Sequence, residues 1–357
     1  MASSDLPVDF HCPISLEPMT DPVILSTGHT FDRASIQRWL DTGHRTCPIT
    51  KLPLPDPPLL IPNLALRSLI NSDPHSPAHL DHRSLISSLS ASTCPSIKLE
   101  TLTRLDRFLR GHPGGYRGDS ALVSAVLCCA HSTDKGLRRK ALAVLLSLSL
   151  DDDNKVGLVA EGGMGTILGA LTGGDRASSA MAATVVTSLA MVEVNKATIG
   201  EYPGMIVGLV GAMGGGKGVR VRKEAATALC TLCGFAGNRR RAVEEGAVEA
   251  AVGAAREGVE RGVEVLGALG KCREGRDRVL RCEGVVEILV WVLRNNGSKR
   301  GVRCALLLLL WMCSCSERRW SEARNQGVVE ICVGLVDDED EKITRSASSL
   351  IQVLQRD

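Results

Sequence analysis

Aromatic residues are scarce in this chain. Phenylalanine, tryptophan and tyrosine supply only 3% of its 357 residues, although 44% of the residues are hydrophobic. The chain can therefore bury a large core, but it must build that core mainly from alanine, valine and leucine. Such a composition suits a stack of small helices better than a large compact enzyme, and the length allows two domains or one elongated array.

Net charge and long apolar runs are also missing. The 42 basic side chains nearly cancel the 40 acidic ones, leaving +2 at neutral pH, so the composition gives no general reason to expect nucleic acid as a partner. The longest strongly apolar run, Ala305 to Cys315, is too short to cross a bilayer, and we expect no membrane span. The N-terminus lacks a signal-peptide profile, and Ala2 stands where N-myristoylation needs a glycine.

Disulfide signals are absent as well. The 13 cysteines are odd in number and show no small-domain disulfide framework. Most of them lie in apolar helical runs such as Leu127 to Ala130, so we expect reduced, buried thiols in a cytoplasmic protein. Cys230 and Cys233 match a Cys-x-x-Cys pattern, but they lie in a leucine- and alanine-rich helix without a thioredoxin-like βαβ context, which makes them core residues.

Metal ligands are too few in the N-terminal stretch. Within residues 8–72 the candidates are Cys12, Cys47, His11, His29 and His44, with no Cys-x-x-Cys pair. Each closed zinc site takes four such ligands, so we expect no metal and no other cofactor. The two cysteines also lack a base and an orienting residue at a recognisable spacing, which favours a structural role over an acyl-accepting one.

Residues 10–54 have instead the pattern of a small α+β module. Val23 to Leu25 form a short apolar run, Ser26 to Gly28 supply a turn, and His29 to Phe31 can return as the second strand of a hairpin. Asp32 can cap a helix that starts directly after it, since its carboxylate can accept hydrogen bonds from first-turn amides.

Two loops pinned by Cys-Pro pairs flank this helix in the sequence. The pairs are Cys12-Pro13 and Cys47-Pro48, and we expect the two loops to converge beside the helix. Ile36, Trp39 and Leu40 fall on one helical face.

The ordered set of motifs closely resembles the U-box of ubiquitin ligases over roughly residues 8–72. The matching residues are Cys12-Pro13-Ile14, Asp21-Pro22-Val23, Gly28 to Arg33, Ile36, Trp39, Cys47 to Thr50, Ile61 to Asn63 and Leu66-Arg67. The resemblance implies that hydrogen bonds and ion pairs replace the two zinc ions of related RING modules. The candidates for those bonds are Glu17, Asp21, His29, Asp32, Arg33 and the two Cys-Pro loops.

The resemblance also implies a docking surface for a ubiquitin-conjugating enzyme charged with ubiquitin. In this family the residues at the positions of Ile14, Trp39 and Pro48 contact that enzyme, and a shallow apolar patch suits transient binding. Packing of the loops, or of the core for Trp39, remains the alternative. Lys51 stands where many modules of this class place a basic residue that touches the bound ubiquitin, although an arginine would make the better bidentate donor.

An extended return and further helices follow the module. Residues 52–62 carry five prolines and should form an ordered, extended segment, after which Asn63 can cap a helix over residues 64–70. Two more helices are expected near residues 79–90 and 95–110, the second with leucines at helical spacing.

From residue 119 the chain repeats with a period near 40. Asn154-Lys155, Asn195-Lys196 and Asn238-Arg239 lie 41 and 43 residues apart. A glycine-containing turn follows each motif, first at Gly162-Gly163 and then at Gly204 and Gly246, and Gly284 and Gly327 continue the series. An apolar helix is expected after each turn, and an alanine- and leucine-rich helix at the end of each unit. This pattern is typical of armadillo-type repeats, in which each unit leaves an apolar face for its neighbour to cover.

The array contains one candidate substrate groove. Its residues are Arg139, Lys223, Arg303 and Arg345, which each stand two residues before an alanine of a unit's last helix. Such a basic ladder would line a groove for an acidic protein partner, while solvated helix starts remain the alternative. Arg239 to Arg241 form either a nuclear-import signal or a charge cluster at a repeat edge, so the expected localisation is cytoplasmic, with the nucleus left open.

Both regions together resemble the plant U-box/armadillo family over nearly all of the chain. The expected fold class is mainly α, with a small α+β U-box module followed by an α-solenoid of armadillo-type repeats. We predict a tail at residues 1–7, a U-box domain at 8–78, connecting helices and a Gly/Pro linker at 79–118, and the repeat array at 119–357.

The family implies a ubiquitin ligase that promotes ubiquitin transfer, without a covalent intermediate of its own, to a protein substrate held by the repeats. A non-catalytic armadillo scaffold or regulator with an inactive U-box is the main alternative. An importin-like cargo carrier fits less well, because Trp291, Trp311 and Trp320 cluster in one region instead of forming a ladder along the array.

Overall fold

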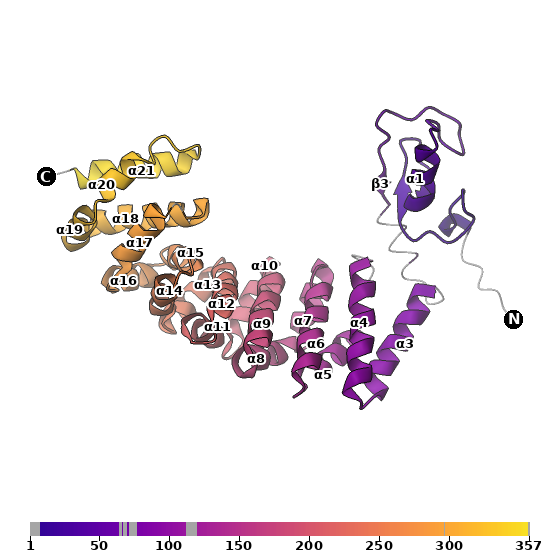
Figure 1. Cartoon of the computed structure of the whole chain (residues 1–357), viewed down its shortest axis with the longest axis horizontal. Coiled ribbons are helices and arrows are strands. Elements are labelled where there is room, and N and C mark those ends of the chain that lie inside the picture. Colours follow the sequence, from indigo (N-terminus) through magenta and orange to yellow (C-terminus); the bar gives the residue numbers. More distant parts are fainter. Residues whose placement is uncertain are drawn as a thin grey trace. The chain divides into compact units, whose positions relative to one another are not determined.

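The computed structural model describes residues 8–63, 66, 70, 77–111, 120–295 and 297–355. The chain divides into two compact units, Met1–Ser92 with Arg107–Arg117, and Thr93–Asp106 with Gly118–Asp357. The predicted tail at 1–7, most of the predicted helix over 64–70 and most of the break at 111–118 lie outside the described residues. Mainly helical structure with a small stranded region at the N-terminal end confirms the predicted fold class (Figure 1).

The first unit opens with a small sheet and one helix. Its elements are η1 (Val8–Phe10), β1 (Pro22–Ile24), β2 (Thr30–Asp32), α1 (Arg33–Asp41) and β3 (Ile61–Pro62). The strand order is β2-β1-β3 and both pairings are antiparallel, with Val23 opposite Phe31 on one side and Pro62 on the other. The predicted hairpin is therefore confirmed. Its turn needs Gly28, whose φ of 80° is strained for any residue with a side chain.

Asp32 joins the first loop, the hairpin and α1. Its carboxylate accepts a hydrogen bond from the N–H of Ala34 at 3.2 Å, which is the predicted helix cap. The same carboxylate accepts from the N–H groups of Thr20 and Asp21 at 2.8 and 2.9 Å. Beside it, Arg33 Nε donates to Asp21 at 2.7 Å. These bonds fasten the loop to the helix.

Both Cys-Pro loops contribute to one hydrophobic core, as expected from their positions on either side of α1. The buried residues of this core are Cys12, Met19, Val23, Leu25, Phe31, Ile36, Leu40, Cys47, Leu54 and Ile70. Ile14 and Trp39 pack against it from outside and stay partly exposed. The module therefore has an apolar interior and a second, half-buried apolar layer near its loops.

Two helices follow, close to the predicted ranges. They are α3 (Pro77–Ala91) and α4 (Pro95–Gly111). Further upstream, Asn63 Oδ1 accepts a hydrogen bond from the N–H of Leu66 at 3.0 Å. This contact has the geometry of the predicted cap, although most of the helix after it lies outside the described residues.

The helices of the second unit follow one another along the array in sequence order from α5 to α21 (Figure 1). They form three rows, because each repeat contributes a first, a second and a third helix. The first helices of the repeats are α7 (Asp152–Ala160), α10 (Glu193–Glu201), α13 (Ala236–Glu244), α16 (Arg273–Arg281) and α19 (Glu317–Asn325). The second helices are α5 (Ser120–Ala130), α8 (Gly163–Gly173), α11 (Met205–Gly214), α14 (Ala247–Arg256), α17 (Val285–Arg294) and α20 (Val328–Val333). The third helices are α6 (Lys135–Leu148), α9 (Arg176–Leu189), α12 (Val219–Leu232), α15 (Arg261–Leu269), α18 (Lys299–Cys315) and α21 (Glu341–Leu354).

Neighbouring repeats pack row on row. Each third helix contacts the next third helix, and each second helix contacts the next second helix. Burial of alanine, valine and leucine between the rows makes a continuous core, which explains how the array manages with so few aromatic side chains. Of the described helices, none is by itself long and apolar enough to cross a membrane; only α7 and α8, bent by 81°, pass such a test when joined.

A left-handed glycine opens the second helix of five repeats. The glycines are Gly162, Gly204, Gly246, Gly284 and Gly327, with φ between 71° and 83°. The predicted series is confirmed, and in its first member, the pair Gly162-Gly163, it is Gly162 that has the positive φ. Gly163 is needed for a different reason, since a Cβ there would lie 2.7 Å from the Leu158 carbonyl oxygen. The predicted helix over residues 328–336 ends earlier, at Val333.

Buried asparagines fasten the earlier repeats. The Nδ2 groups of Asn154, Asn195 and Asn238 donate to the carbonyls of Leu148, Leu189 and Leu232, each the last residue of the preceding third helix. Asn195 and Asn238 also donate to the carbonyls of Lys155 and Lys196 in the repeat before, at 3.1 and 2.7 Å. The Asn-Lys/Arg motif thus supplies side-chain donors to the ends of third helices, where carbonyls have no partner within their own helix. We call these three contacts the asparagine latches.

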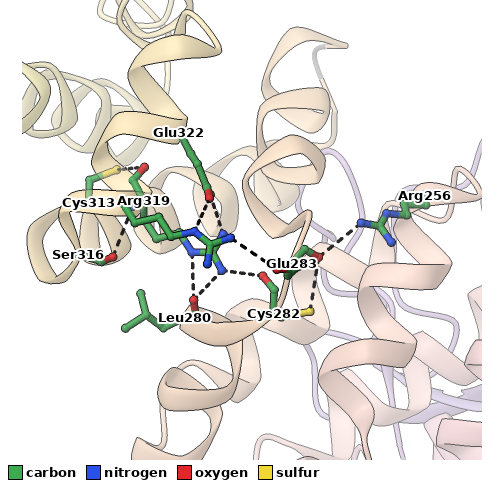
Figure 2. A network of polar contacts seen from close by, with 9 residues as sticks. Arg256, Leu280, Cys282, Glu283, Cys313, Ser316, Arg319 and Glu322 are labelled. Atoms are coloured by element: carbon green, nitrogen blue, oxygen red, sulfur yellow. Dashed lines mark hydrogen bonds and ion pairs between the residues drawn. The ribbon is translucent and has the colours of Figure 1, made fainter.

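The later repeats use other donors. At the end of α15 the Cys272 thiol donates to the Leu269 carbonyl at 3.2 Å, and Gly275 occupies the position of the asparagine. In α19 that position is taken by Arg319, which is 2% exposed. Figure 2 shows its guanidinium reaching across to the end of α16, where it donates to the carbonyls of Leu280 and Cys282, while Glu322 pairs with it at 2.6 Å.

Candidate functional site

The two Cys-Pro loops of the module have the same backbone geometry. Cys12 N–H donates to the Glu17 carbonyl at 2.8 Å and Leu16 N–H donates to the Cys12 carbonyl at 2.8 Å. In the second loop, Cys47 N–H donates to the Leu52 carbonyl and Lys51 N–H to the Cys47 carbonyl, both at 2.9 Å. Leu16 and Lys51 each have a φ of 60°, which is uncommon for residues with side chains. The two loops therefore share the same turn, with a strained left-handed residue at the same position in each.

Donors near the sulfur lower the pKa of both buried loop cysteines. Burial raises the pKa of the Cys12 thiol, but the backbone amides of Ser15, Asp32 and Ile14 outweigh it, so the pKa lies below its ordinary value. The Asp32 N–H lies 3.3 Å from this sulfur. The pKa of Cys47 also lies below its ordinary value. Burial raises this pKa, but the hydroxyls of Thr27 and Thr50 and nearby backbone amides outweigh that effect.

Neither sulfur is accessible, because both cysteines are 0% exposed. They act as acceptors inside the fold and offer no nucleophile to a substrate. No group of three or more His, Cys, Asp and Glu side chains within the described ranges is placed to hold a metal ion. Of the residues expected to replace metal ligands, Asp21, Asp32 and Arg33 form the bonds described above, and His29 Nδ1 lies 3.1 Å from the Thr27 carbonyl. Glu17 contributes through its backbone.

Trp39 is held at the end of α1 by the second loop. Its indole Nε1 donates to the Thr46 carbonyl at 3.0 Å, and the His44 ring stacks on it with centroids 3.9 Å apart. The Lys51 ammonium lies 5.8 Å from the ring centroid and donates to the Pro48 carbonyl at 2.8 Å. One side of Trp39 thus packs on the core while the ring remains partly exposed, so the core and docking interpretations both describe part of this residue.

The structure brings together three of the four predicted docking residues. Trp39, Pro48 and Lys51 are linked by the contacts just described, and Ile14 packs against the same core from the other loop. The sequence analysis did not assign two exposed apolar loop residues to the docking surface. These are Ile49, which is 45% exposed, and Leu16, which is 77% exposed. They hold the loop positions equivalent to Ile14 and Lys51. The signal that would have found them is the recurrence of Cys-Pro-Ile in both loops.

The predicted basic ladder of the array does not behave as one set. Arg139 pairs with Asp175 at 3.2 Å, and Arg303 pairs with Asp340; both carboxylates cap the next third helix of the row. Lys223 lines a hollow of about 680 Å³ at α12 and α15, and Arg303 lines an adjoining one of about 430 Å³. Arg345 is exposed on α21. Two of the four cations therefore tie neighbouring repeats together, and a role in substrate binding stays a prediction for all four.

The three arginines of the suspected import signal are also engaged within the array. Arg239 donates to the carbonyls of Cys233 and Gly234. Arg240 pairs with Glu244 and Arg241 with Glu201, at 2.9 and 2.8 Å.

Comparison with known proteins gives the same division of the chain. The model of the U-box domain matches residues 6–74, and the model of the plant U-box protein ARM repeat region matches residues 84–357. U-box domain-containing protein 8 of Arabidopsis thaliana is 50% identical over 366 residues, which cover 98% of this chain and 97% of that protein.

Solved structures confirm the repeat fold. A designed armadillo repeat protein superimposes with a TM-score of 0.56 at 15% identity, covering 65% of this chain and all of that one. A structure from a study of the interaction between cadherin and beta-catenin gives a TM-score of 0.64 at 16% identity, covering 76% of this chain and 52% of that one. The chain belongs to the plant U-box proteins with an armadillo repeat region, a family of ubiquitin ligases.

Proposed function

We propose that this chain is a ubiquitin ligase whose U-box recruits a ubiquitin-conjugating enzyme charged with ubiquitin, and whose armadillo repeats hold the protein substrate. The observation that carries the proposal is the half-exposed Trp39, fixed between α1 and the Cys47 loop and flanked by Pro48 and Lys51. An apolar patch of this kind is held rigid by hydrogen bonds on its inner side. It therefore loses little conformational entropy when it binds a partner.

Catalysis by such a module is positional. The buried thiols of Cys12 and Cys47 leave no acyl-accepting group at the docking surface, so the thioester stays on the conjugating enzyme until a substrate lysine attacks it. Restraining the flexible conjugate in a reactive geometry lowers the barrier by removing rotational and translational freedom in advance, an effect that can reach several kcal/mol.

Lys51 is suited to contact the bound ubiquitin. Its ammonium has three donors, of which one reaches the Pro48 carbonyl, and the hydrogen bond from its N–H to the Cys47 carbonyl fixes its place in the loop. A cation there can donate to the ubiquitin carbonyls when the conjugate folds back on the U-box. The alternative, an inactive U-box on an armadillo scaffold, predicts no such contribution from Lys51.

A double variant, Ile14→Ala with Pro48→Ala, tests the docking surface. Each change removes apolar area from a weak interface and should cost about 1 to 2 kcal/mol of binding, or roughly 5- to 30-fold in affinity. Discharge of ubiquitin from the conjugating enzyme should fall accordingly. Leu59→Ala is the matched control, because Leu59 is 61% exposed elsewhere in the module. Full discharge by a double variant with an unchanged melting temperature would refute the assignment of this site.

Lys51→Gly separates recruitment from activation. Glycine adopts a φ of 60° without strain, so the variant removes the cation while keeping the loop. We expect discharge to fall about tenfold, the effect of losing one charge-assisted hydrogen bond, while binding of the conjugating enzyme is retained. Leu16→Gly makes the same backbone change in the other loop and reports what glycine alone does to the melting temperature. Undiminished discharge by Lys51→Gly would favour the scaffold alternative for this residue.

A further inference from the structure

An apolar hollow with a basic rim lies on the third-helix row of the array. Its volume is about 430 Å³, within the range of ligand pockets, and it is lined from α15, α16 and α18. On α18, Cys304, Leu307 and Trp311 recur at the spacing of one helical face, and Leu307 is 56% exposed. Burial raises the pKa of the Cys304 thiol to about 11, so this wall carries no charge from the cysteine near neutral pH.

Gly267 on α15 and Gly270, the residue that follows this helix, shape the opposite wall. A Cβ at Gly267 would lie 2.7 Å from the Cys304 sulfur, and a Cβ at Gly270 would lie 3.1 Å from the Leu308 side chain. The missing side chains allow α18 to approach α15 closely and leave Ala268 as the small residue of that wall. The hollow is therefore a built feature of this repeat pair, which depends on glycine at a helix position where glycine is otherwise unfavourable.

The rim carries a surplus of positive charge. Arg300 pairs with Glu264 at 2.9 Å, and Arg303 pairs with Asp340, so these two cations are already neutralised in part. Lys271 and Arg276 are exposed on the same rim and have no ion pair with any of the residues that the structure describes. Glu264 is only 4% exposed and is shared with Arg261 at 2.6 Å, so it offers little negative charge to the surface.

We propose that this hollow binds an acidic peptide segment of a substrate protein, with a leucine or phenylalanine side chain against Leu307 and Trp311 and carboxylates at Lys271 and Arg276. The adjoining hollow shares Arg300 and Glu264 with it and is lined also by Glu260, Arg261 and Lys223, of which Lys223 places a further cation toward α12. The proposal rests on the proposed function, of which it names the substrate class. Two of the predicted ladder positions line the two hollows, Arg303 and Lys223, and the proposal adds Lys271, Arg276, Leu307 and Trp311, which the sequence analysis did not assign to substrate binding.

Charge and apolar shape together favour a peptide over other anions. A nucleic acid strand would need a row of free cations and stacking rings, whereas Trp311 is the only ring among the described residues that line this hollow. A carboxylate peptide with one large apolar side chain matches both features at once. Binding should therefore weaken with salt and also depend on the apolar side chain.

The test uses the full-length chain and a fluorescein-labelled peptide in which glutamate alternates with phenylalanine. Fluorescence anisotropy should show saturable binding that is lost when lysine replaces each glutamate or serine replaces each phenylalanine. Leu307→Ser and Lys271→Glu should each weaken binding roughly 5- to 30-fold. Their matched controls are Leu150→Ser, at a leucine that is 67% exposed on the same array, and Lys135→Glu, at the exposed start of α6. Both controls should bind as the wild type does.

Several results would overturn the proposal. These are equal binding of the lysine peptide, equal losses in the variants and their controls, or a preference for vesicles of anionic phospholipid over the peptide. If Leu307→Ser lowers the melting temperature, Lys271→Glu decides the matter, since its exposed side chain carries no core packing. Ubiquitin discharge by the wild-type chain is measured in the same preparation. Active discharge without peptide binding refutes only the hollow, and peptide binding without discharge refutes only the ligase.

Discussion

The earlier and later repeats of the array use different hydrogen-bond donors to fasten the junctions between their helices. Each third helix ends with a carbonyl group that no residue of its own helix can satisfy. In the earlier repeats a neutral, buried asparagine amide supplies the donor, and it does so three times in succession. In the later repeats the Cys272 thiol takes this place at the end of α15, whereas the buried Arg319 guanidinium of α19 donates to carbonyls at the end of α16, the first helix of the repeat before.

The difference shows that the repeats need a donor at the junction more than they need a particular residue. A buried amide is desolvated at modest cost, whereas a buried guanidinium must be paired, here by Glu322. The earlier array therefore spreads its latching over three equivalent sites. The later array uses the Cys272 thiol and concentrates its remaining donors in one charged residue, Arg319, so we expect it to be more sensitive to a single substitution at that residue.

Arg319→Met should have the largest effect on stability. It removes the donors to the carbonyls of Leu280 and Cys282 and leaves Glu322 without its buried partner, so unfolding should become easier by about 3 kcal/mol. Hydrogen exchange should locate the loss in α19 to α21. Arg318→Met, at a neighbouring arginine that is 66% exposed, should change little. Equal exchange in both variants would contradict the central place given to Arg319.

Asn195→Ala should cost less, about 2 kcal/mol, since it leaves the carbonyls of Leu189 and Lys155 without this donor but buries no charge. Urea unfolding of the full chain measures the effect, with Thr198→Ala on the exposed side of α10 as control. A loss as large as that of Arg319→Met would remove the distinction between spread and concentrated latching.

Gly275→Ala tests why the asparagine series stops. A Cβ at this position would lie 2.1 Å from the Leu269 carbonyl oxygen, so the backbone must shift, at a cost of about 1 to 2 kcal/mol. Gly253→Ala in α14 is the matched control, because nothing lies within 4 Å of its added Cβ. The control should be neutral or slightly stabilising. A neutral Gly275→Ala would mean that an asparagine latch could have formed at this junction.

Asp175 tests a feature that the earlier and later repeats share, and its expected effect is the smallest. Arg139 pairs with Asp175 in the earlier repeats, and Arg303 pairs with Asp340 in the later ones. Burial raises the pKa of Asp175, but Ser178, Ala177 and Arg139 together lower it from 3.8 to about 2. Its stabilisation is therefore present above pH 3.8 and is lost as the pH falls toward 2. Asp175→Asn should reduce stability by about 1 kcal/mol near neutral pH and much less near pH 2. Urea unfolding at both pH values checks this, and a pH-independent loss would contradict the assignment.

Much of the architecture could be predicted because it depends on local rules. The Asp32 cap, the Gly28 turn and the repeating glycines each follow from the backbone conformation that one residue type permits. For the first turn the sequence offers the pair Gly162-Gly163, because two adjacent glycines satisfy the same pattern. Only the backbone shows which of them has the positive φ.

Contacts between distant residues were harder to predict. Arg139 and Arg303 resembled a substrate ladder in sequence, yet each pairs with the aspartate that caps the next third helix of the row. Arg319 carries no motif at all, since its carbonyl partners lie 37 and 39 residues away and carbonyls leave no trace in a sequence.

The sequence alone determined the two kinds of module, the family and the repeat period, because hydrophobic spacing, turn glycines and Cys-Pro motifs act within a few residues along the chain. Tertiary structure decided which donors close each junction and which side chains stay open on the surface. Leu307 and Trp311 line a hollow beside Gly267 and Gly270, whose missing side chains let α18 approach α15. In the sequence, α16 and α17 separate the two glycines from α18. Close packing between repeats depends on the volumes of both partners, and no single segment contains that information.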